Sequence, residues 1–292
     1  MSVDKLQERI RKCKNPSVVD FFATPEQIPP HILQEEGNFT AAYNRFCREL
    51  LQGLKGIVPA VRFICGGSAL LGDGGIPLLR DLLQFAADQG FYVFLDGVEA
   101  LSAHSAQRNA ELMFSQELGL SFDGLILSSY IGSDGLRPFA QKAIAEKKGL
   151  YVVARTANRS APELQDLLTG SRLVHAAAAD ISNRLADSTV GKSGYGQIGV
   201  MAGASSAESL RNLRAKYKYL FLLLDGYDYP NSNAKNCAYA FDSLGHGAAD
   251  CAGSSITAAW LDDGTDGKDY IDCAVRSAER MKKNLTRYIT IL

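Results

Sequence analysis

Short and nearly continuous apolar runs recur along the chain and alternate with amphipathic segments. Strands that are covered on both faces of a parallel sheet lose the usual alternation of apolar and polar residues, so we interpret the apolar runs as buried strands. Eight such strands are predicted, at residues 17–22, 60–65, 91–96, 123–129, 150–155, 196–203, 219–225 and 248–255.

The segments between these runs have the spacing of amphipathic helices. Residues 38–54 and 75–90 are examples, and Gly90 stands where a glycine commonly ends a helix. About eight strand-then-helix units in 292 residues predict an α/β protein with a single (β/α)8 barrel domain over residues 1–292. An open, doubly wound sheet is the alternative, because a strand count made from one sequence can miss by one or two.

Two segments depart from this rhythm. Residues 175–196 are expected to add a second helix and a glycine-rich loop before the sixth strand, and residues 225–236 form a polar loop after the seventh. The run VGKSGYG, at 190–196, is not a phosphate-binding P-loop, because Ala186 replaces the first glycine of that pattern and the run precedes a strand.

The charge balance of the chain narrows the class of partner. The net charge is -1, with 22% charged and 46% hydrophobic residues. A nucleic-acid or anionic-membrane surface needs a basic excess, so we expect a small-molecule ligand and neither nucleic acid nor membrane. No apolar run approaches the roughly 20 residues that span a bilayer. The first residues are charged and lack the apolar region of a signal peptide, which predicts a cytoplasmic protein.

Cysteine and histidine spacing gives no sign of a metal site or a nucleophilic triad. The six cysteines are scattered without C-x-x-C spacing, so no metal is expected. Of the four histidines, His104 alone stands near a predicted strand end, and a lone histidine is more often structural.

Polar residues stand at the predicted C-terminal ends of the strands, where (β/α)8 barrels bind their ligands. An arginine, an aspartate and several hydroxyls facing one mouth could hold a polar, anionic ligand, or they could simply cap the barrel and meet solvent. The sequence leaves both interpretations open. The strand-end set is Phe22, Arg62, Asp96, Ser128, Arg155, Thr156, Gly203, Asp225 and Ser254.

Four phrases make the chain similar, over nearly its whole length, to the long bacterial form of orotidine 5'-phosphate decarboxylase. They are KNPSVVDFF…IPPHIL near the start, LILSSYIGSDGLRPF, GLYVVARTANRSAPELQDL and GYGQIGVMAGASSAESLRNLR. The family text reads approximately TVNPYLGSD-x-L-x-PF for the second phrase, KG-x-[VF]-x-L-x-RTSNP for the third and GY-x-x-VG-x-VVGAT-x-PEEL for the fourth. The resemblance implies a (β/α)8 barrel of the pyrimidine biosynthesis family, a lyase that uses no cofactor.

The resemblance also implies where the chemistry would lie. The family carries a D-x-K-x-x-D motif at the end of the third strand, and its lysine protonates the carbon from which CO2 leaves. Here the motif reads DGVEAL, so that Asp96 keeps the first aspartate, while Val98 and Leu101 replace the lysine and the second aspartate. Valine cannot donate a proton, which predicts that decarboxylation is lost.

Other residue positions of the expected site also differ from the family sequence. Arg62 takes the place of the second-strand lysine, and arginine is a poor general acid at neutral pH. Phe22 replaces the first-strand aspartate, and Ser128 with Ser129 replaces an Asn-Pro pair. The loop at 225–233, with its two aspartates, replaces a phosphate-binding Gln-Gly-Gly loop, and Gly253-Ser254 replaces Ser-Arg. The substrate-binding candidates that remain are Arg62, Ser128, Arg155 and Ser254.

Three hypotheses follow. The preferred one is a catalytically degenerate barrel kept as a binding or regulatory protein, with a nucleotide as one candidate ligand. The second is an enzyme of changed specificity that uses Asp96, Glu99, Arg62 or Arg155, and the third is an active decarboxylase that forms UMP. The resemblance implies a homodimer, or a heterodimer with an intact paralogue, in which the residue at position 101 reaches the partner's site.

Overall fold

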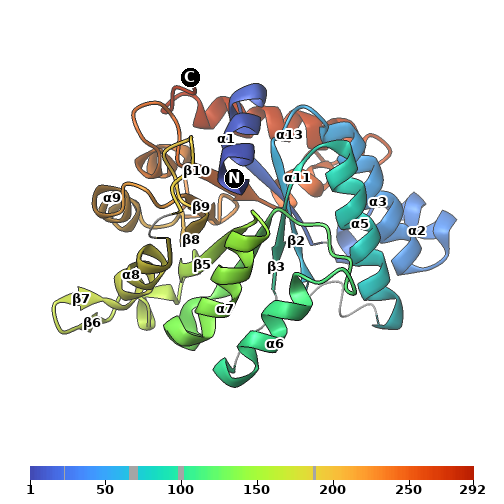
Figure 1. The fold of residues 1–292 in the computed structure, drawn as a ribbon. Helices are drawn as coiled ribbons and strands as arrows, with labels where there is room; N and C mark the ends of the chain where they lie inside the picture. Colours follow the sequence, from blue (N-terminus) through green and yellow to red (C-terminus); the bar gives the residue numbers. More distant parts are fainter. Residues whose placement is uncertain (23, 66–71, 98–101, 187–188) are drawn as a thin grey trace.

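The main sheet is a closed barrel of eight parallel strands. The computed structural model describes residues 1–292 except 23, 66–71, 98–101 and 187–188 (Figure 1). The barrel order is β1-β10-β9-β8-β5-β4-β3-β2. The predicted (β/α)8 barrel is therefore confirmed, and the open-sheet alternative is wrong. The strands are β1 (Ser17–Phe21), β2 (Ala60–Ile64), β3 (Tyr92–Asp96), β4 (Gly124–Ser128), β5 (Gly149–Arg155), β8 (Ile198–Gly203), β9 (Leu222–Asp225) and β10 (Ala248–Ala252).

Helices surround the barrel and bury its outer face (Figure 1). The segment predicted at 38–54 is a helix that begins after Asn38, whose side chain accepts a hydrogen bond from the Ala41 amide, and the next ends at Gly90, with φ 95°. The helices are α1 (Ser2–Cys13), α2 (Pro30–Glu36), α3 (Phe39–Leu54), α5 (Gly75–Gln89), α6 (Ala103–Met113), α7 (Gly132–Ala145), α8 (Val174–Ala186), α9 (Ala207–Lys216), α10 (Ala234–Cys237), α11 (Ser254–Thr257), α12 (Ala259–Asp262) and α13 (Tyr270–Leu285). None of the helices in the described parts of the chain is long and apolar enough to cross a membrane.

The segment between β5 and β8 differs from the prediction. Helix α8 occupies most of the first half of 175–196 as expected, but no other α-helix is described between these strands. Instead, β6 (Leu168–Thr169) and β7 (Arg172–Leu173) form an antiparallel hairpin that projects from the barrel (Figure 1). The hairpin was missed because strands of two residues carry no periodic pattern.

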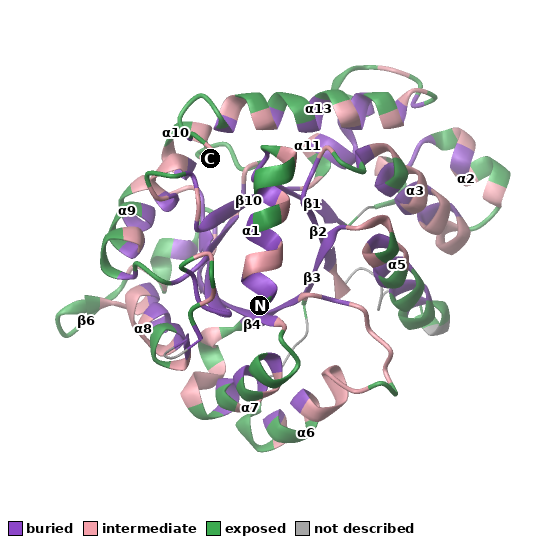
Figure 2. Cartoon of the chain, turned by 45° about the horizontal axis from the view of Figure 1, so that its top comes forward, coloured by how far each residue is buried: buried purple, intermediate pink, exposed green. Residues whose placement is uncertain are grey.

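Helix α1 covers the end of the barrel at which the strands begin (Figure 2). Its apolar face, with Val3, Leu6 and Ile10, packs against the aromatic interior of the barrel. The Ser2 hydroxyl hydrogen-bonds with the Tyr92 hydroxyl at 2.8 Å. Because α1 covers this end, the polar groups at the opposite end of the strands form the accessible mouth.

Candidate functional site

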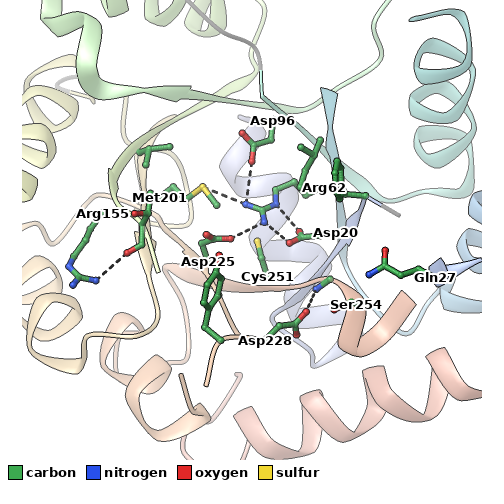
Figure 3. A pocket seen from close by; sticks show the side chains of 17 residues that line it. Asp20, Gln27, Arg62, Asp96, Arg155, Met201, Asp225, Asp228, Cys251 and Ser254 are labelled. Carbon is green, nitrogen blue, oxygen red and sulfur yellow. Dashed lines mark hydrogen bonds and ion pairs between the residues drawn. The ribbon is translucent and has the colours of Figure 1, made fainter. Parts of the chain in front are cut away.

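A cavity of about 440 Å³ opens at the C-terminal ends of the strands (Figure 3). Every second residue of a barrel strand points inward, so inward side chains from different strands meet in layers. The interior apolar layers include Val18 of β1 and Phe94 of β3, and two residues further along these strands come Asp20 and Asp96. The cavity is lined by Asp20, Phe22, Gln27, Arg62, Ile64, Asp96, Val153, Arg155, Thr156, Met201, Asp225, Gly226, Asp228, Tyr229, Cys251, Gly253 and Ser254.

Arg62 lies in the floor of this cavity, with three carboxylates around it (Figure 3). Asp20 is its register partner on β1 and binds the guanidinium through both oxygens, with Nε donating to Oδ1 at 2.7 Å. Nη2 also donates to Asp225 Oδ1 at 2.8 Å, and Nη1 lies 3.3 Å from Asp96 Oδ2. The guanidinium is therefore committed to protein carboxylates.

Two of the carboxyl groups around Arg62 have raised pKa values. Burial raises the pKa of Asp20 to about 6; Arg62 opposes this shift, and the charges of Asp225 and Asp96 add to it. Burial also raises the pKa of Asp96, against the opposing effect of Arg62. The Arg62 pKa is lowered by burial, but the charges of Asp20 and Asp225 outweigh that effect and raise it well above its ordinary value. Arg62 thus stays charged and cannot serve as a proton donor.

The charge of the second arginine in the cavity, Arg155, is neutralised by Asp166, which lies outside the cavity lining. Arg155 Nε and Nη2 donate to the two oxygens of Asp166, both at 2.9 Å, in a bidentate pair. Nη1 donates to the Thr156 carbonyl at 3.2 Å and to the Ser205 hydroxyl at 3.4 Å. His175 Nδ1 lies 3.0 Å from Asp166 Oδ1 and completes the network. Arg155 therefore brings little uncompensated positive charge to the cavity.

Asp228, in the loop after β9, closes the side of the mouth next to β10. Its Oδ2 accepts hydrogen bonds from the backbone amides of Gly253 at 2.9 Å and Ser255 at 3.3 Å. Its Oδ1 accepts from the Ser255 hydroxyl. The backbone donors at this edge are thus already occupied by a carboxylate of the chain itself.

The structure brings most of the predicted strand-end residues together. Phe22, Arg62, Asp96, Arg155, Thr156, Asp225 and Ser254 all line the cavity. Ser128, the remaining substrate-binding candidate, does not line it; its exposed Oγ accepts a hydrogen bond from the Tyr130 amide. Gly203 ends β8 outside the lining, and His104 lies exposed in the first turn of α6. Val98, Glu99 and Leu101 lie outside the described residues.

Sequence reasoning missed several residues of the cavity. Asp20 is the charged residue within the apolar run SVVDFF of the first predicted strand, and a charge inside a buried strand is a usable signal. Met201 and Cys251 carried no such signal, because apolar residues in buried strands are expected. The inward direction of these side chains depends on strand register, which the sequence does not specify.

These features define the class of protein as a (β/α)8 barrel with a carboxylate-rich ligand cavity at its C-terminal mouth. Comparison with known proteins supports the resemblance noted in the sequence. The chain is 29% identical over 232 residues to orotidine 5'-phosphate decarboxylase of Rhodopirellula baltica, covering 76% of this chain and 77% of the relative. It is 24% identical over 287 residues to the enzyme of that name from Clostridium botulinum strain Langeland, covering 98% and 99%. The chain is thus a relative of the orotidine 5'-phosphate decarboxylases.

Solved structures agree on the fold. The putative orotidine-monophosphate decarboxylase of Toxoplasma gondii superposes with a TM-score of 0.78 at 17% identity, covering 97% of this chain and 98% of that one. The putative orotidine 5'-phosphate decarboxylase of Streptomyces avermitilis gives 0.77 at 20% identity, covering 98% and 95%. No protein-family model matches the chain.

Proposed function

We propose that this barrel does not decarboxylate orotidine 5'-phosphate and is kept as a small-molecule binding or regulatory protein. The observation that carries the proposal is the kind of cation in the cavity. Among the described lining residues the basic side chains are Arg62 and Arg155, and both are bound by carboxylates. A guanidinium held in this way does not transfer a proton at neutral pH.

The segments that the structure does not describe cannot supply the missing lysine either. Their sequences are Ala23, GGSALL at 66–71, VEAL at 98–101 and Asp187-Ser188. These segments contain no lysine, arginine or histidine, and 98–101 adds the acidic Glu99. The proposed absence of a catalytic lysine therefore does not depend on where these segments lie.

The charge of the cavity further supports the proposal, because the relatives are named for a phosphate ester. Asp20, Asp96, Asp225 and Asp228 all line the mouth, and their charge repels a phosphate dianion. Asp228 also occupies the amides of Gly253 and Ser255, which would otherwise be available to an anion. The described lining therefore offers neither a lysine to act as the proton donor nor an unpaired cation to bind phosphate.

A direct assay of CO2 release from orotidine 5'-phosphate tests the proposal, with an active decarboxylase as the positive control. We expect no turnover by the purified protein and no thermal stabilisation by UMP. A ligand present at 100 times its dissociation constant would add about 2.7 kcal/mol to the free energy of unfolding. The Asp96→Asn variant, purified in the same way, is the matched control, because a contaminating decarboxylase would give the same turnover in both preparations. Turnover that requires Asp96 would refute the proposal.

The assembly of the protein stays a proposal that follows from the resemblance. We expect a dimer of this chain, or a heterodimer with an intact paralogue. Light scattering on the purified protein, alone and mixed with a paralogue from the same organism, distinguishes these states. A protein that stays monomeric in both experiments would contradict the expectation.

A further inference from the structure

We propose that the cavity at the barrel mouth binds a small organic cation, an amine or an amidine, whose positive charge faces Asp225 and Asp96. This inference rests on the proposed function, because it names the class of ligand that the retained cavity would bind. It departs from the anionic substrate for which the relatives are named.

The carboxylates around Arg62 outnumber its single positive charge. Asp20, Asp96 and Asp225 all contact this one guanidinium, so the group carries two negative charges in excess when the carboxylates are ionised. Asp228 adds a further carboxylate to the lining, whereas the charge of Arg155 is already matched by Asp166. Excess charge in a half-enclosed site is costly unless a counter-charge arrives. A cationic ligand supplies that counter-charge.

A carboxylate oxygen in the cavity remains available to accept a hydrogen bond from a ligand. Arg62 binds both oxygens of Asp20 but only Oδ1 of Asp225. Within the described chain, Asp225 Oδ2 accepts no hydrogen bond, and the side chain is 23% exposed. Beside it, the almost fully buried Cys251 side chain forms part of the cavity floor (Figure 3). The N–H groups of an ammonium or amidinium ligand can donate hydrogen bonds to Asp225 Oδ2.

The walls of the cavity favour an organic cation over a metal ion. Ile64, Val153 and Met201 give the cavity an apolar side, and Phe22 and Tyr229 stand at the rim with 42% and 43% exposure. Aromatic faces attract cations as well as apolar groups. The carboxylates converge on Arg62 instead of on a common point, and no group of three His, Cys, Asp or Glu in the described ranges has metal-site geometry. A volume of about 440 Å³ suits a small organic molecule.

The undescribed segments near β2 and β3 do not change the charge argument. Residues 66–71 and 98–101 directly follow Cys65 and Gly97, and between them they contribute Glu99 and no basic side chain. The excess negative charge therefore persists wherever these segments lie.

The test uses matched small molecules that differ in charge. Benzylamine, benzamidine, benzyl alcohol and benzoate are titrated into the full-length protein at pH 7.5 and low salt, with calorimetry and thermal shift as readouts. We expect the two cations to bind and to raise the melting temperature, and their affinity to fall as salt is added. Equal binding of benzyl alcohol and benzylamine, or no binding of either cation at 10 mM, would overturn the inference.

Two variants locate the binding. Asp225→Asn keeps the size of the side chain and removes its charge, and we expect benzylamine affinity to fall at least tenfold. Asp88→Asn removes one charge from the exposed end of α5 and is the matched control, with affinity unchanged. Circular dichroism confirms folding, and Asp96→Asn replaces Asp225→Asn if that variant is unfolded. Equal affinities of the site and control variants would also overturn the inference.

The decarboxylase assay separates the two proposals. Absence of both CO2 release and cation binding removes the inference about the ligand and leaves the proposed function intact. CO2 release that depends on Asp96 removes the proposed function, whatever the amines do.

Discussion

Arg62 is the residue on which the mouth of the barrel depends. It is almost completely buried and binds three carboxylates, so it holds together the ends of β1, β3 and β9. A buried ion pair contributes little net stability compared with apolar packing, but loss of one partner leaves uncompensated charge in the interior. Substitution of Arg62 is therefore expected to lower the free energy of unfolding.

We predict that Arg62→Met lowers the free energy of unfolding by about 3–5 kcal/mol at pH 8, as expected for a broken buried pair. The loss should be smaller at pH 5, because the raised pKa of Asp20, about 6, lets this carboxyl take up a proton there. Urea unfolding at the two pH values measures the difference. Arg62→Lys keeps a positive charge and should lose less; equal losses for both variants at both pH values would contradict the prediction.

Asp228 is expected to fasten the loop after β9 to the start of α11. In Asp228→Ala the Gly253 and Ser255 amides lose their acceptor, so their hydrogen exchange should become faster. Asp228→Asn keeps one acceptor oxygen and should be intermediate. NMR-detected exchange of these two amides provides the measurement. Unchanged protection in the alanine variant would show that Asp228 does not fasten the loop.

At the scale of elements, the close approach of β5 and β8 sets the position of Arg155. The pairing of the two strands shifts register between Val153 and Arg155, at the point where β5 reaches the mouth. Gly203, at the end of β8, lies so close to the other strand that a Cβ atom would come within 2.4 Å of the Thr156 carbonyl oxygen. Glycine is required here by space.

We predict that Gly203→Ala destabilises the protein by roughly 1–3 kcal/mol, the usual range for overpacking. The strand ends must separate to admit the methyl group, because backbone atoms block it. Gly74→Ala is the control, since Gly74 has a negative φ and its Cβ would make an ordinary contact of 3.7 Å with Thr40. Denaturant titration of both variants measures the effect. A loss at Gly203 no larger than that at Gly74 would contradict the steric argument.

At the scale of the whole molecule, buried carboxyls make stability depend on pH. Asp250 points from β10 into the surrounding core, and neither carboxylate oxygen has a hydrogen-bond partner among the described residues. Burial raises its pKa from 3.8 to about 7, although the adjacent Cys237 thiol opposes the shift. The folded state therefore keeps a proton that the unfolded state has lost between pH 4 and pH 7. Through this group, stability falls as pH rises across that range.

We predict that Asp250→Asn is more stable than the original protein at pH 8 and that the advantage shrinks at pH 5. The amide carries no charge at either pH, so the variant avoids the cost of ionising a buried group. The two pH values should differ by roughly 1–3 kcal/mol, given the size of the pKa shift. Thermal and urea unfolding of the two proteins supply the comparison. An advantage of the variant that is the same at both pH values would mean that Asp250 is ionised at little cost, and it would contradict the prediction.

The positions of the barrel strands could be predicted to within about three residues. The run at 219–225 became β9 at Leu222–Asp225, and 17–22 became β1 at Ser17–Phe21. The reason is physical, because strands that are buried on both faces consist mostly of apolar residues. Helix α1 as the cover of one barrel end was not predicted, since its apolar face differs in no way from that of an ordinary surface helix.

The sequence by itself determined the strand-helix rhythm, the relation to the decarboxylases and the absence of basic residues from the motif DGVEAL. Tertiary structure decided that Asp20 and Asp225 converge on Arg62, that Asp166 neutralises Arg155, and that Asp228 occupies the amides beside β10. Apolar periodicity is a local property, so the chain reveals it directly. The charge balance of the cavity depends on strand register and on which side chains point inward, and these are fixed only when the barrel closes.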